Sequence, residues 1–194
     1  MKVFSVVVGE LKANCYIVSN SHGRAFVIDP GDDAGKIRRC LEDNGLEARF
    51  IVNTHGHIDH IKADVALGLP VYIHEEDLEI VSDPAKNITT IFFGTFEPVA
   101  QARLLRDGDK VTLDELTFTV IHTPGHTRGS VCLFGHGVLF SGDTLFRNGI
   151  GRTDYPGASS RKIEESLVRL SRLAAETIVY PGHGPQTTIG RELG

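Results

Sequence analysis

The chain has 194 residues, of which 41% are hydrophobic and 23% are charged, and its net charge is −5. These values are typical of one globular domain, residues 1–194, that buries its core without disulfide support. They argue against a passive nucleic-acid binder, which usually carries a basic surface, and no apolar stretch reaches the length of a membrane span.

The N-terminal half alternates short β-branched runs with turns and two helical segments. The first helix is expected at 34–44, where Asp32 or Asp33 can cap its start. A second helix is expected from about His60 to Leu67, closed by Gly68. The expected strands of this half are Val3–Val8, Cys15–Ser19, Arg24–Ile28, Arg49–Asn53 and Val71–Ile73.

The C-terminal half is rich in strands and contains one long amphipathic helix. This helix is expected at about Ser160–Ala175, with Ile163 and Leu167 on its apolar face. The segment Ser82–Pro98 is apolar and rich in turns, which fits either a loop packed on the core or a lid over a site. Strand runs separated by helices indicate a layered α/β architecture. The expected strands are Lys110–Leu113, Leu116–His122, Ser130–Phe134, Gly137–Ser141 and Thr177–Tyr180.

Three histidines and one aspartate fall within the six-residue segment HGHIDH, which directly follows an expected strand. Side chains two positions apart in an extended or turning segment can face the same side, so His55 and His57 can bind one ion. Asp59 and His60 can face a second ion beside it. Imidazole and carboxylate ligands suit zinc, iron or manganese, so the segment predicts a metal site.

Three further side chains of metal-binding type follow other expected strands, each in a turn with glycine or proline. They are His126 in TPGHT, Asp143 in SGDT and His183 in PGHG. A carboxylate after an apolar strand is costly to bury unless it is paired or coordinates a metal. Because a sheet holds the loops at its strand ends rigidly, we expect these residues to converge with the first cluster on one site.

Four other histidines lack this setting. We expect His22 and His136 to be solvated in hairpin turns, and we expect His74 to be structural. His122 lies close to the predicted site in the sequence. It is either structural or an outer partner of a ligand imidazole.

The motifs THGHIDH, TPGHT, SGDT and PGHG, in that order, resemble those of the metallo-β-lactamase superfamily. The resemblance covers nearly the whole chain. It implies a four-layer αβ/βα sandwich, in which two mixed β-sheets are flanked by helices, with a site for two metal ions at one edge. The implied ligands are His55, His57 and His126 for the first ion, Asp59, His60 and His183 for the second, and Asp143 as a bridge, with a hydroxide between the ions.

Within the superfamily, the run from GDTLF to GIGRTDY resembles short bacterial proteins of the glyoxalase II (hydroxyacylglutathione hydrolase) type. This resemblance implies a substrate contact for Arg152, with Tyr155 as its neighbour in the pocket. Asp143, where zinc β-lactamases often have cysteine, favours a non-lactamase branch. Two features depart from the pattern. We expect no C-terminal glutathione-binding helical domain after Gly194, and Ile61–Asp64 replaces a common Gly-Gly turn.

The expected function is hydrolysis of a small-molecule thioester or ester by a metal-bound hydroxide that Asp59 orients. Zinc is the expected metal, and iron and manganese are alternatives. The alternative functions are an iron-dependent persulfide dioxygenase, which shares the run Gly151–Asp154, a phosphodiesterase or nuclease, and a catalytically silent binding domain. Three cysteines without CxxC spacing fit a reducing cytoplasm, and the short apolar N-terminus predicts no signal peptide.

Overall fold

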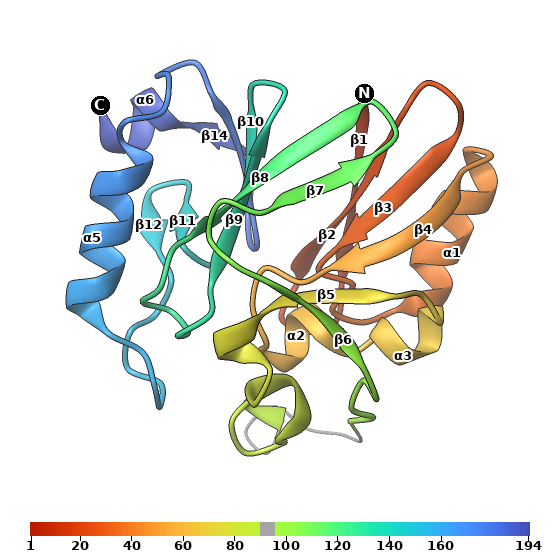
Figure 1. Ribbon diagram of the computed structural model, residues 1–194, viewed down its shortest axis with the longest axis horizontal. Helices are drawn as coiled ribbons and strands as arrows, with labels where there is room; N and C mark the ends of the chain where they lie inside the picture. The colour runs from red at the N-terminus through yellow and green to blue at the C-terminus, as the bar shows by residue number, and fades with distance from the viewer. Residues whose placement is uncertain (90–95) are drawn as a thin grey trace.

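A computed structural model describes residues 1–89 and 96–194, which include two six-stranded sheets packed face to face (Figure 1). The first sheet has the strand order β1 to β6. Neighbours from β1 to β3 are antiparallel and neighbours from β3 to β6 are parallel, so the sheet is mixed. Its strands are β1 (Lys2–Val8), β2 (Ala13–Ser19), β3 (Arg24–Ile28), β4 (Glu47–Val52), β5 (Val71–His74) and β6 (Ala102–Leu105).

The second sheet has the order β14-β13-β10-β9-β8-β7. It is also mixed, because β10 and β13 are parallel while the other neighbours are antiparallel. A small hairpin, β11 (Leu145–Phe146) and β12 (Gly149–Ile150), follows β10. The strands of the sheet are β7 (Lys110–Leu113), β8 (Leu116–His122), β9 (Val131–Gly135), β10 (Val138–Gly142), β13 (Ile178–Pro181) and β14 (Thr187–Thr188).

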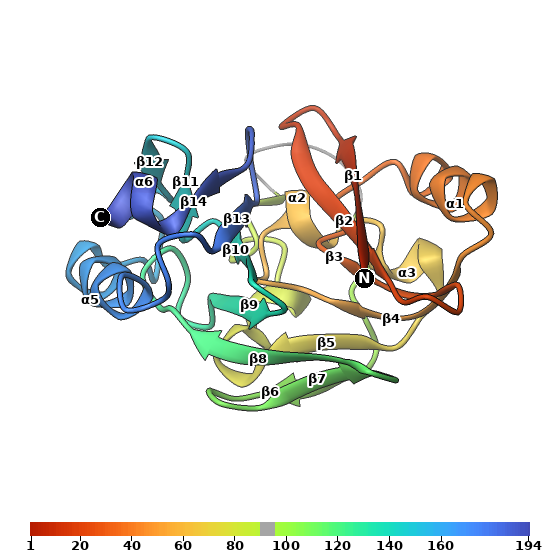
Figure 2. The same ribbon diagram turned by 90° about the horizontal axis from the view of Figure 1, so that it is seen from above.

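Helices cover the outer face of each sheet, which gives the four layers seen from above in Figure 2. Helix α1 (Ala34–Asp43) and the short α3 (Asp64–Leu67) lie against the first sheet, and α5 (Ser160–Leu170) and α6 (Ile189–Leu193) lie against the second. The short α2 (Ile58–Ile61) follows β4, and two 3-10 helices (Glu75–Asp77 and Ile80–Ser82) follow β5. The predicted αβ/βα sandwich with two mixed sheets is therefore confirmed.

Three apolar clusters fill the three spaces between these layers. Phe26, Phe118 and Phe140 are fully buried in the cluster between the sheets, where the ring centroids of Phe26 and Phe118 are 5.5 Å apart. A second cluster joins the first sheet to α1 through Ile37, and a third joins the second sheet to α5 through Leu170. Because both faces of each sheet are covered, a central strand such as β2 is buried along its whole length.

The prediction of a single helix at about His60–Leu67 is wrong, since the structure has the two short helices α2 and α3 there. The backbone N–H of Ala63 donates to the carbonyl of Pro30 at 2.9 Å and so leaves the helical hydrogen-bond ladder. The preceding turn packs closely at this point, because a Cβ on Gly31 would lie 1.5 Å from the Asp59 carbonyl oxygen. The predicted end at Gly68 is confirmed, with a left-handed backbone there.

Several boundaries also differ from the predictions. Helix α5 ends at Leu170, short of Ala175, because the chain must turn back at residues 171–177 to enter β13. Asp33 stands at the start of α1, but its carboxylate accepts hydrogen bonds from the Gly9 N–H and the Lys36 ammonium and makes no cap. The short elements β6, β11, β12, β14 and α6 were not predicted.

The predicted loop or lid at Ser82–Pro98 includes residues 90–95, which lie outside the described residues. Among residues 1–89 and 96–194, no helix has the length and apolar character needed to cross a membrane.

Candidate metal centre

Four loops at strand ends bring the seven predicted ligands together at one edge of the sandwich. The loop after β4 carries His55 and His57, and α2, which continues it, carries Asp59 and His60. The loops after β8, β10 and β13 carry the other three, which are His126, Asp143 and His183. The first sheet therefore supplies four of these side chains, and the second sheet supplies three.

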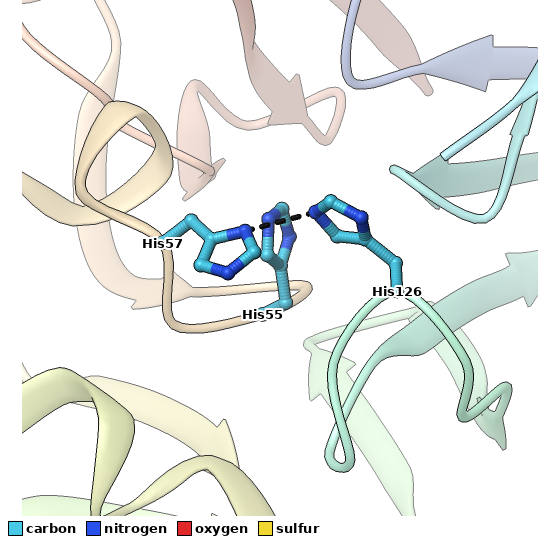
Figure 3. Close-up of side chains that lie close together, drawn as sticks. All are labelled: His55, His57 and His126. Carbon is cyan, nitrogen blue, oxygen red and sulfur yellow. Dashed lines mark hydrogen bonds between the residues drawn. The ribbon is translucent and has the colours of Figure 1, made fainter. Parts of the chain in front are cut away.

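The first group consists of His55, His57 and His126, whose imidazole rings turn toward one another (Figure 3). One ring nitrogen from each residue lies within 4.8 Å of the other two. His57 Nδ1 and His126 Nε2 are 2.9 Å apart, and His55 Nε2 is buried without a hydrogen-bond partner. Three converging nitrogens, one of them unpartnered, form a site that a metal ion would fill.

The second group consists of Asp59, His60 and His183. His183 Nε2 lies 3.2 Å from Asp59 Oδ2 and 3.3 Å from His60 Nε2. The other ring nitrogen of His60, Nδ1, lies 3.0 Å from the Asp29 carboxylate, which fixes the ring so that Nε2 faces the group.

Asp143 lies between the two groups. Its Oδ1 is 3.4 Å from His60 Nε2, and its Oδ2 is 3.5 Å from His126 Nε2 and 3.7 Å from His183 Nε2. Asp143 Oδ1 is buried and has no hydrogen-bond partner. A carboxylate placed between two nitrogen-rich groups can bridge two cations, so the donor set fits a pair of divalent transition-metal ions.

The two groups differ in their affinity for protons. Burial, reinforced by the neighbouring histidines, lowers the pKa values of His55 and His57, so these two imidazoles are neutral at pH 7. Burial also opposes protonation of His60, but the Asp59, Asp143 and Asp29 carboxylates outweigh it and raise its pKa to about 10. Burial works against ionisation of Asp59, yet His60 and His183 lower the pKa of this carboxyl group.

Two buried carboxylates that were not predicted as site residues support the loops. Asp29 accepts hydrogen bonds from the N–H and hydroxyl of Thr54, both at 2.7 Å, as well as contacting His60. Asp77 accepts from backbone N–H groups of the loops after β4 and β8. The sequence around Asp29, Asp-Pro-Gly, is typical of a turn and gives no sign of a contact with a metal ligand. The sequence around Asp77 carries no comparable signal.

Glycines allow the ligand loops to approach one another closely. A Cβ on Gly182, which precedes His183, would lie 2.2 Å from Asp143 Oδ1 and 2.8 Å from His60 Cε1. A Cβ on Gly142 would lie 2.3 Å from Thr54 Oγ1. Gly142 of SGDT and Gly182 of PGHG are therefore required by packing at the centre.

The remaining histidines lie apart from the ligand groups. His22 and His136 are exposed in hairpin turns, as predicted. The rings of His74 and His122 stack with centroids 4.0 Å apart, and His74 Nδ1 accepts from the Glu76 N–H, so the structural interpretation of His74 is confirmed. His122 Nε2 contacts the Arg128 carbonyl oxygen at 2.8 Å, so it supports the loop of His126 without touching a ligand.

A cavity of about 380 Å³ opens over the metal-binding groups. Its walls are largely apolar, and Arg152 and Tyr155 lie among its lining residues. The Arg152 guanidinium lies 4.5 Å from the centre of the Tyr155 ring and makes two hydrogen bonds to Asp154, at 2.9 and 2.7 Å. The Tyr155 ring also meets the His57 ring edge to face at 5.5 Å. The apolar lining residues are Leu11, Ile88, Phe146 and Ile150.

The fold and this constellation define a metal-binding α/β sandwich, and comparison with known families identifies its class. The model of the metallo-beta-lactamase superfamily matches residues 8–183. The chain belongs to the metallo-beta-lactamase superfamily, as its motifs predicted.

Two relatives align over nearly their whole length. An uncharacterized protein of Mycobacterium leprae is 44% identical, with 95% of this chain and 92% of the relative covered. The hydroxyacylglutathione hydrolase GloC of Haemophilus influenzae is 31% identical, with 99% of this chain and 95% of the relative covered.

Solved structures from different branches of the superfamily share the fold. The B3 metallo-beta-lactamase BLEG-1 has a TM-score of 0.91 and 36% identity, covering 98% of this chain and 95% of its own. TTHA1623 in a di-iron-bound form has a TM-score of 0.88 and 38% identity, and the match covers 97% of this chain and 96% of TTHA1623. ETHE1 from Myxococcus xanthus has a TM-score of 0.78 and 28% identity, and the match covers 98% of this chain and 80% of ETHE1. These neighbours therefore leave the specific reaction of this chain open.

Proposed function

We propose that this protein hydrolyses small-molecule thioesters of the hydroxyacylglutathione type, with two divalent metal ions, expected to be zinc, held by the seven residues of the centre. The observation that carries the proposal is the position of Asp143 between two complete groups of three ligands, at the base of the apolar cavity. The similarity to a hydroxyacylglutathione hydrolase supports the choice of a thioester over other substrates.

The first ion would be held by His55, His57 and His126, the second by Asp59, His60 and His183, and both by Asp143. Metal ions bound in this way lower the pKa of coordinated water toward about 7 and polarise a carbonyl oxygen. The donor set fits this role because two of its buried polar atoms, His55 Nε2 and Asp143 Oδ1, have no partner within the protein.

The residues of the chain supply orientation and a proton acceptor. Asp59 stays ionised because His60 and His183 lower the pKa of its carboxyl group. It borders the cavity, where it can orient the attacking water and accept its proton. A thiolate is a good leaving group, so the departing sulfur needs little assistance from an acid.

The cavity lining supports a substrate with an apolar portion and an anionic end. The apolar side chains Leu11, Phe146 and Ile150 line the cavity and can contact the carbon atoms of the acyl group. Arg152 provides a cation among the lining residues, although it is paired with Asp154. We propose that a carboxylate of the thiol portion binds Arg152 in exchange for Asp154.

The deciding experiment is elemental analysis of protein purified without added metal, followed by assay with S-lactoylglutathione. Two equivalents of zinc and metal-dependent release of glutathione support the proposal. Two bound metals without thioester hydrolysis would refute the substrate and leave the metal centre intact. The matched control is Asp59→Asn, which retains the size of the side chain and removes its negative charge.

An iron-dependent persulfide dioxygenase is the second candidate. It is favoured by the run Gly151–Asp154, which resembles that group, and by the similarity to the structure of ETHE1. The di-iron-bound form of TTHA1623 supports iron as a metal for this chain, although with two ions. A single iron per chain with oxygen consumption on glutathione persulfide would establish it in place of the hydrolase. β-Lactam and phosphodiester substrates belong in the same assay series, because the superfamily includes the B3 structure and two-metal centres also serve phosphoryl transfer.

The three cysteines support a proposal about the cellular compartment of the protein. Cys15, Cys40 and Cys132 are free thiols, and we propose that the protein works in a reducing cytoplasm. The acidic net charge of −5 favours a small-molecule substrate over nucleic acid.

A further inference from the structure

Asp77 is a fully buried carboxylate outside the seven predicted ligands. It ends the 3-10 helix Glu75–Asp77 and accepts three hydrogen bonds. Its Oδ2 accepts from the Gly56 N–H at 2.9 Å and from the Thr127 hydroxyl at 2.7 Å, and its Oδ1 accepts from the Gly129 N–H at 2.6 Å. Both oxygens are therefore engaged by donors from other parts of the chain.

These donors belong to the two loops that carry the first group of ligands. Gly56 separates His55 from His57 in the loop after β4, and Thr127 follows His126 in the loop after β8. Since β4 lies in the first sheet and β8 in the second, Asp77 connects loops from the two halves of the sandwich, and these loops carry the three imidazole rings. Asp29 has the corresponding place behind the second group, where it contacts His60.

The two loops pack closely against the segment that carries Asp77 and Ile80. A Cβ on Gly129 would lie 2.6 Å from the Asp77 backbone nitrogen, and a Cβ on Gly56 would lie 2.8 Å from Ile80 Cγ2. An asparagine at position 77 would direct its NH₂ group toward either the Gly129 N–H or the Gly56 N–H. In both orientations two donors would face each other, and one loop would have to move.

We propose that Asp77 is a positioning residue that sets the metal affinity of the first group, His55, His57 and His126, by holding its two loops in register. The inference rests on the metal centre of the proposed function and is independent of its substrate. Outer partners of metal ligands typically contribute 10- to 100-fold to affinity. Because Asp77 acts through the backbone next to the ligands, we expect the lower end, about tenfold.

The test is zinc titration of the metal-free full-length protein in backgrounds that isolate each group. His183→Ala retains the first group, and His57→Ala retains the second. Asp77→Asn should weaken zinc binding about tenfold in the His183→Ala background and leave it unchanged in the His57→Ala background. Such a selective loss is not expected from general destabilisation, which would affect both groups.

The matched control is Asp64→Asn. Asp64 is also buried, and it accepts a hydrogen bond at 2.6 Å from Asn53, the first residue of the loop after β4, but it makes none to the loop after β8. An asparagine at position 64 still accepts this bond through its amide oxygen, so the change should alter neither affinity. The proposal would be overturned if Asp77→Asn left the zinc affinity of the His183→Ala protein unchanged. It would also be overturned if Asp77→Asn lowered the zinc affinities of the His183→Ala and His57→Ala proteins equally. Should Asp77→Asn fail to fold, Thr127→Val removes a single donor. Thr127→Val must then lower the zinc affinity of the first group and leave that of the second group unchanged. An unchanged zinc affinity of the first group would overturn the proposal.

Thioester hydrolysis plays no part in this readout. If the protein binds two zinc ions and fails to hydrolyse any thioester, the proposed substrate is wrong while the role of Asp77 stands. If Asp77→Asn binds zinc normally and the wild-type enzyme is active, the role of Asp77 is wrong while the function stands.

Discussion

The opposite proton affinities of the two ligand groups predict that only one of them binds metal in a strongly pH-dependent way. The Asp59, Asp143 and Asp29 carboxylates overcome the effect of burial and raise the pKa of His60 to about 10, so the metal-free protein carries a proton there at pH 7. A metal ion must displace this proton before it can bind. Burial lowers the pKa values of His55 and His57, so neither carries a proton to be displaced at that pH.

The size of the effect follows from the position of the His60 pKa. Between pH 6.5 and 8.5 the working pH stays below that pKa, so each pH unit lowers the cost of removing the proton by about 1.4 kcal/mol. The zinc affinity of the second group should therefore rise about tenfold per pH unit, or about 100-fold over this range. His183, whose pKa is raised by Asp59 and Asp143 against the effect of burial, adds to the rise at acidic pH.

The assay is zinc binding by isothermal titration calorimetry, in two buffers of different ionisation enthalpy, with a competing chelator. His57→Ala, which retains the second group, should release at least one proton per zinc ion. His183→Ala, which retains the first group, should bind zinc with an affinity that changes little with pH above pH 7. A second group that binds zinc with the same affinity at pH 6.5 and 8.5, without proton release, would refute this account of the electrostatics.

The other predictions concern catalysis, packing and metal removal. Asp59→Ala should abolish turnover while circular dichroism shows an intact fold, and near-normal activity would contradict the role given to this carboxylate. Asp154→Asn should lower KM for an anionic thioester several-fold by freeing Arg152, with no change for a neutral thioester measured in parallel. Gly182→Ala should reduce zinc binding by more than tenfold, since its Cβ would overlap Asp143, and a normal metal content would contradict the packing argument. Chelation should lower the melting temperature reversibly, because an ion present at 1,000 times its Kd stabilises the fold by about 4 kcal/mol.

The sequence was most informative where a motif and a strand end coincide. HGHIDH, TPGHT, SGDT and PGHG each combine a rare side chain with a turn after an apolar strand, and loops at strand ends are held by the sheet. The order of these motifs also predicted the superfamily and its four layers, and the fold and the family match confirm both. The ligand assignments and the substrate contacts of Arg152 and Tyr155 remain predictions that metal analysis and kinetics must test.

Features that depend on contacts between distant segments could not be predicted in the same way. Strand β6 is short and partly exposed, so its alternation is weak. The break between α2 and α3 arises because the Ala63 N–H bonds the distant Pro30 carbonyl, which no local pattern reveals. Asp77 looks like an ordinary acidic residue after a strand, and its donors lie 21 to 52 positions away in the chain.

The division of the ligands between the two sheets has a consequence for the mechanical integrity of the sandwich. His55, His57, Asp59 and His60 come from one half, and the rest of the set comes from the other. An ion bound by ligands from both halves would link the two sheets at this edge. The hydrogen bonds of Asp77 to loops of both halves are a second link at the same edge. With metal bound as proposed, separating the sheets at this edge would require breaking coordination bonds as well as apolar contacts, so the metal ions would also stabilise the contact between the two sheets.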